Sequence, residues 1–143
     1  MKLIDEDTKK VLLQRDFFYE VKIMKKCFSL LSSYDSIYFE PVLESFLVHI
    51  RNLYEFFYQD GNGDKSHAQH FIKEWVKVPD KKIKDFYIKI NHYLSHLSYN
   101  RVIKIYEPWN IKRIYTHFKL LIKEFLKILP DKYLNKELKQ LIW

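Results

Sequence analysis

The chain has 143 residues, of which 48% are hydrophobic and 17% aromatic, and its formal net charge is +7. This length and apolar content suit one domain with a sizeable core and exclude an intrinsically disordered chain. Two glycines and four prolines are too few for the tight turns of an all-β fold. We therefore predict an all-α fold in which residues 1–143 form a single-domain helical bundle of four main helices plus one or two short helices.

The first half of the chain carries two long amphipathic segments. Apolar residues at three- and four-residue steps predict a first helix over about residues 7–32. A polar break over residues 32–36 separates it from a second helix, which tolerates Pro41 in its first turn and reaches about Tyr58. Both glycines then fall in segment 60–64, where a sharp chain reversal is cheap, so we expect the loop between the two halves there.

The second half also contains two long predicted helices. We expect a short helical stretch over residues 71–76 and a third helix over about residues 80–98. A fourth helix is predicted to begin with Pro108 at its first helical position, because that position needs no backbone N–H. Pro130 should end this helix, and Asp131 is expected to cap a final short one.

The second helix has a polar centre. It is apolar nearly all round, which is typical of a central, buried helix, yet helical angles place His49 on one flank, Arg51 on the other and Asn52 behind. A buried arginine requires a partner, and Glu44 and Glu55 lie on its side. An internal ion pair is therefore one interpretation of these residues, and a functional site is the other.

The third predicted helix ends in a polar run that contains His92, His96 and Arg101. In an unbroken helix Arg101 would point more than about 100° away from His96. The two side chains can converge only if the chain unwinds near Ser98 or if a partner helix brings them together.

The residues LESFLVHIRNLYEFF (43–57) and INHYLSHLSYNR (90–101), followed by Trp109, resemble a group of small bacterial helical proteins. These are similar to the HEPN superfamily, compact helical bundles that include RNA-cleaving toxins and phage-defence proteins. The resemblance covers about residues 35–125.

The nuclease signature of that superfamily is an arginine, often followed by asparagine, with a histidine after four to six intervening residues. Arg51 and Asn52 match its first half, but the positions for the histidine hold Phe56, Phe57 and Tyr58. The resemblance alone therefore does not make this chain a ribonuclease, and whether it is an enzyme stays open.

If the chain cleaves RNA, the resemblance implies a site formed by His49, Arg51, Asn52, His96 and Arg101. His49 or His96 would serve as general base towards a ribose 2′-hydroxyl, because histidine titrates near neutral pH. Arg51 or Arg101 would stabilise the charge that develops on the phosphate. Members of the superfamily often dimerise and build the site across the interface, so we expect either a homodimer or another protein partner.

A basic stripe on the fourth helix is the candidate RNA-binding surface. Its residues are Lys112, Arg113, Lys119, Lys123 and Lys127. Such a stripe can follow a phosphate backbone, with nearby tyrosines stacking on bases, and it can equally be the solvated face of an amphipathic helix.

We therefore predict a basic, HEPN-like protein that contacts RNA in phage defence or stress, and the alternative is a non-catalytic protein-interaction module with an aromatic-rich surface. We expect no cofactor and no metal, although His67, His70, His92 and His96 offer imidazole nitrogens. The lone Cys27 and the lack of a bilayer-length apolar run predict a cytoplasmic protein without membrane contact.

Overall fold

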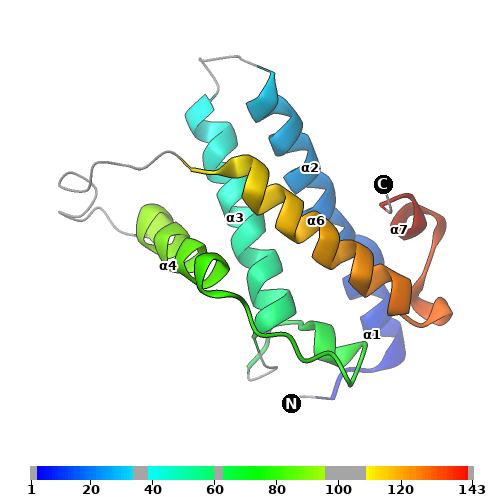
Figure 1. Cartoon of the computed structure of the whole chain (residues 1–143). Helices are drawn as coiled ribbons and strands as arrows, with labels where there is room; N and C mark the ends of the chain where they lie inside the picture. The colour runs from blue at the N-terminus through cyan, green and yellow to red at the C-terminus, as the bar shows by residue number, and fades with distance from the viewer. Residues whose placement is uncertain (1–2, 34–38, 60–62, 96–108, 142–143) are drawn as a thin grey trace.

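The computed structural model describes residues 3–33, 39–59, 63–95 and 109–141 (Figure 1). Over these ranges the chain consists of helices and connecting loops, without a strand, which confirms the predicted all-α class. Among these residues no helix is long and apolar enough to cross a membrane.

The first long helix is capped by Asp5, close to its predicted start. Asp5 accepts a hydrogen bond from the backbone N–H of Thr8 at 2.9 Å, and α1 (Glu6–Val11) follows. The chain continues through the π-helical segment η1 (Leu12–Phe17) into α2 (Phe18–Ser32), so the helix predicted over residues 7–32 is confirmed. Its α2 part packs against both α3 and α6.

The second helix, α3 (Phe39–Tyr58), lies at the centre of the molecule. Figure 1 shows α2 along one side of α3, α4 (Lys81–Ser95) on its other side, and α6 (Ile111–Ile128) crossing α2 and α3. This placement explains why α3 is apolar nearly all round, since three neighbours cover it.

An aromatic cluster around Phe125 joins η1, α3 and α6. Phe125 is fully buried, and its ring lies 5.3 to 6.5 Å, centroid to centroid, from five other aromatic rings, those of Phe17, Phe56, Phe57, Phe71 and Trp75. Most of these pairs are edge-on, the arrangement that the ring quadrupoles favour. The cluster sets how the helices pack and so determines which of their flanks meet.

The segment after the glycine loop differs from the prediction. Residues 71–76 form no helix. A short 3-10 turn, η3 (Ala68–His70), precedes them, and beyond Trp75 the chain is irregular up to α4. The reason is tertiary, because the Trp75 indole N–H donates to the backbone carbonyl of Phe57 at 3.0 Å and holds this segment against α3.

Two predicted helix starts also differ. The fourth helix begins at Ile111, where the Asn110 side chain accepts from the backbone N–H of Arg113, and Pro108 lies outside the described residues. Pro130 ends the chain's last long helix as predicted, but Asp131 opens the 3-10 turn η4 (Asp131–Tyr133). Asn135, and not Asp131, caps the final helix α7 (Lys136–Gln140).

Candidate functional site

A carboxylate on α2 holds the polar centre of α3. Glu20 accepts from His49 through Oε2, with Nδ1 at 2.6 Å, and from the Asn52 amide through Oε1 at 3.2 Å. His49 and Asn52 therefore face α2 together. Sequence reasoning missed Glu20, although its position next to the apolar stripe, three residues after Phe17 and four before Met24, is a signal for it.

The contact with Glu20 determines which nitrogen of His49 is left for a ligand. An ionised carboxylate only accepts hydrogen bonds, so Nδ1 carries the proton and, in the neutral ring, Nε2 presents a lone pair. The side chain of His49 is 10% exposed, and among the described residues its recorded hydrogen bond is made through Nδ1. Nε2 is therefore the ring nitrogen that these residues leave for a ligand. The exposed ring of Tyr19 packs against the imidazole, at 5.6 Å between centroids.

Arg51 lies on the other side of α3. Two residues along a helix correspond to a turn of about 200°, so its side chain leaves the helix away from Glu20. The partner considered from the sequence, Glu55, is occupied by Lys65 Nζ at 2.5 Å and by the hydroxyl of Tyr87 at 3.1 Å. Within the described part of the chain, Arg51 is half-buried and forms no ion pair. His96 and Arg101 lie outside the described residues, so their convergence with Arg51 stays a prediction.

The lysines of α2 and α6 form one basic face. We define it by Lys22, Lys25 and Lys26 of α2 and by Lys112, Lys119, Lys123 and Lys127 of α6. Arg113, which the sequence placed in this stripe, lies instead on the side of His117 and Asp80. Each of these helices contains a single acidic residue, and both acids lie elsewhere. Glu20 binds His49, and Glu124, about 100° round α6 from Lys123, pairs with Lys77.

The two halves of the basic face are close enough to repel. Burial, and secondly the positive charge of Lys119, lower the pKa of Lys25. At the same helix contact the rings of Phe28 and Tyr115 are stacked at 3.8 Å. Packing of α2 against α6 has therefore brought these two positive charges near each other.

A second polar pair lies on the far flank of α6 and was not predicted. The Tyr58 hydroxyl and His117 Nε2 are 2.7 Å apart. Burial, with the nearby negative charge of Asp80, raises the pKa of Tyr58 to about 12, and burial lowers the pKa of His117. Arg113 stands one turn before His117. Three residues separate Arg113 from His117, whereas the HEPN signature requires four to six. A search of the sequence that allowed three intervening residues would have found Arg113 and His117.

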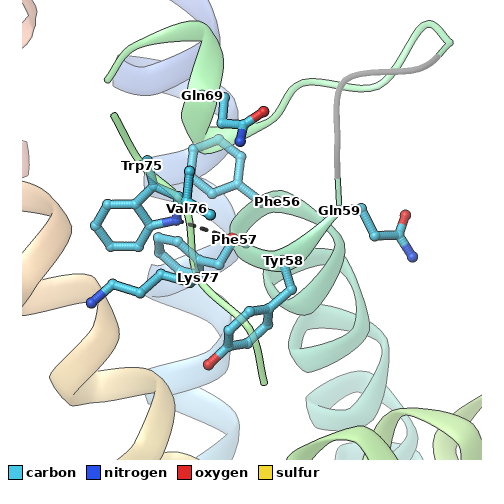
Figure 2. A pocket seen from close by; sticks show the side chains of 8 residues that line it. All are labelled: Phe56, Phe57, Tyr58, Gln59, Gln69, Trp75, Val76 and Lys77. Carbon is cyan, nitrogen blue, oxygen red and sulfur yellow. Dashed lines mark hydrogen bonds between the residues drawn. The ribbon is translucent and has the colours of Figure 1, made fainter. Parts of the chain in front are cut away.

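A small hollow next to Tyr58 is shown in Figure 2. It measures about 130 Å³, and Trp75, Val76 and Lys77 form one wall while the last turn of α3 forms another. Such a volume holds a few water molecules or one base-sized group. It is too small to enclose a stretch of nucleic acid, so contact with a polymer has to occur on an open face of the protein.

Two buried histidines next to the glycine loop have opposite tautomers. His67 Nδ1 donates to the carbonyl of Glu55 at 3.1 Å, so its Nε2 presents a lone pair. His70 Nδ1 accepts from the backbone N–H of His67 at 2.9 Å, so its proton lies on Nε2. One lone pair is too few for a metal ion, and no group of three or more metal-binding side chains occurs among the described residues.

The sequence matches no protein-family model, and neither the curated proteins nor the solved structures give a match. The resemblance to HEPN proteins is therefore neither supported nor opposed by these comparisons.

Proposed function

We propose that this protein binds single-stranded RNA along the basic face of α2 and α6, as a HEPN-like helical domain of the cytoplasm. The observation that carries the proposal is that the only acid in each helix is turned away to a partner on another flank. The solvated face of an ordinary amphipathic helix usually mixes acidic and basic residues. Two neighbouring lysine stripes whose acids pair with other residues therefore favour a binding surface for an anion.

The expected binding energy is mainly electrostatic. Each phosphate neutralised by a lysine or arginine releases condensed counterions, so affinity falls with salt with a slope of about 0.7 per contact for a single strand. Exposed aromatic rings next to the lysines add stacking on bases. Tyr19 and the half-buried Phe18 lie beside Lys22 on α2 and suit this role.

The test is fluorescence anisotropy with a labelled RNA oligonucleotide, titrated over a series of salt concentrations. The variant Lys119→Glu/Lys123→Glu should bind more weakly, with a salt slope lower by about 1.4, since two phosphate contacts are lost. The matched control is Lys82→Glu/Lys84→Glu, which changes the same charge on exposed residues of α4. Equal losses in both variants, or no binding at low salt, would contradict the proposal.

Cleavage is a separate part of the proposal, suggested by the HEPN resemblance to toxins and phage-defence proteins. Purified protein with total RNA in EDTA should then produce fragments, and His49→Ala or His96→Ala should abolish them. Intact RNA together with salt-dependent binding would leave a binding protein without nuclease activity.

The alternative, a protein-interaction module, is favoured by one other observation. Apolar side chains are exposed on both sides of the pair between Lys77 and Glu124, with Val76 and Val78 at 73% and 86% and Leu120 at 61%. A pull-down that recovers one stoichiometric protein, and loses it when Leu120 is changed to Asp, would favour this function over RNA binding.

A further inference from the structure

We propose that His49 accepts a hydrogen bond from a ribose 2′-hydroxyl and so selects RNA over DNA, with Glu20 as the residue that positions it. The inference rests on the proposed binding of a nucleic acid to the basic face. It assigns a ligand group to Nε2 of His49, for which the described residues provide no hydrogen-bond partner.

The first argument is how completely Glu20 is held. One carboxylate oxygen receives His49 Nδ1 at 2.6 Å and the other receives the amide of Asn52 at 3.2 Å. A carboxylate bound at both oxygens cannot rotate freely, so the imidazole that it orients is fixed in both direction and tautomer. An isolated histidine needed only to fill space in a helical core would not require this arrangement.

The second argument is the surface around His49. Tyr19 is 54% exposed, and its ring lies roughly perpendicular to the imidazole at 5.6 Å between centroids, so an exposed aromatic side chain that could stack on a base stands next to His49. Lys22 and Lys26 follow Tyr19 by three and seven residues, so all three share the outer face of α2. A nucleic-acid strand that crosses the outer face of α2 would therefore pass Lys22 and Lys26 before it reaches Tyr19, whose ring contacts the imidazole of His49.

The third argument is the chemistry of Nε2. As a lone-pair acceptor it can bind a hydroxyl proton, and the 2′-hydroxyl is the group by which a protein distinguishes RNA from DNA. A deoxyribose at that position offers no donor. One hydrogen bond of this kind corresponds to a preference of about fivefold for RNA.

The positioning role of Glu20 can be tested without any nucleic acid. ¹⁵N-histidine NMR at pH 8 should show neutral His49 with its proton on Nδ1, whereas an unconstrained imidazole favours the Nε2–H form. Glu20→Ala should return His49 to the Nε2–H form. An Nε2–H tautomer in the unmodified protein would overturn the inference.

The selectivity is tested with RNA and DNA oligonucleotides of one sequence, with deoxyuridine in the DNA so that only the sugar differs. The protein should bind RNA about fivefold more tightly, and both His49→Ala and His49→Phe should lower RNA affinity to that of DNA while DNA affinity stays unchanged. His92→Ala, on an exposed histidine of α4, is the matched control and should keep the preference.

The outcomes separate the two proposals. Equal binding of RNA and DNA by the unmodified protein, with no effect of His49→Ala, overturns the 2′-hydroxyl site and leaves RNA binding by the basic face intact. Lys119→Glu should weaken both nucleic acids alike. No binding of either nucleic acid overturns the proposed function and this inference with it.

Discussion

Replacing Glu20 by alanine tests the central polar contact through the stability of the fold. The change leaves the Nδ1–H of His49 and the amide of Asn52 without their acceptor. His49 is only 8% exposed and its Nδ1–H faces α2, so water reaches this donor poorly, whereas Asn52 is half-buried and can hydrate in part. An unsatisfied buried donor costs about 1–3 kcal/mol, so we expect Glu20→Ala to lower the free energy of unfolding by about 2 kcal/mol.

Urea unfolding measures this loss, and a double-mutant cycle assigns it. With Glu20→Ala, His49→Ala and the double variant, the coupling free energy between the two residues should be about 1 kcal/mol or more. Asp85→Ala removes an exposed carboxylate from α4 and should change stability by less than about 0.5 kcal/mol. A coupling near zero, or a loss from Glu20→Ala no larger than the control's, would refute the view that Glu20 fixes the imidazole.

Further predictions concern pH, the aromatic core and the glycine loop. Burial lowers the pKa of His70 and of His117 below the ordinary 6.5, so the unfolded chain binds more protons than the folded one. Stability is then complete above pH 6.5 and falls as the pH drops below it, which urea midpoints at pH 7.5 and 5.5 would show; a flat profile would contradict this. Phe125→Ala should cost about 3–5 kcal/mol and Leu120→Ala, 61% exposed, about 0.5 kcal/mol, as measured by chemical denaturation. Gly63→Ala should lower stability by about 1 kcal/mol through backbone strain alone, since Gly63 has φ +113° and no atom within 4 Å of an added Cβ, and an unchanged melting temperature would exclude that strain.

The long helices were predictable because their signal is local. Each repeats apolar residues at three- and four-residue steps, and in the fourth helix residues at this spacing, such as Ile114, Phe118 and Phe125, are buried in the structure. Pro130 ended α6 as expected, because proline cannot continue a helix. The angle of about 200° between His49 and Arg51 also followed from the helix alone.

The short segments were not predictable for the opposite reason. Residues 71–76 carry apolar residues at helical spacing, yet the bond between the Trp75 indole and the Phe57 carbonyl holds them in an irregular path. In a segment of a few residues one tertiary contact outweighs helix propensity, since a short helix is marginal in water. The final helix is also short, so its predicted start was unreliable for the same reason. Asp131 begins a 3-10 turn, and Asn135 caps the α-helix that follows.

The sequence by itself determined the all-α class, the long helices and the presence of His49, Arg51 and Asn52 around one helix. Only the tertiary structure decided that His49 and Asn52 share Glu20, which lies 29 residues before His49, and that Lys25 comes to lie near Lys119. Periodicity shows which face of a helix is buried. Which flanks of two helices meet depends on how side chains such as Phe17 and Phe125 interlock, and that packing is a property of the whole core.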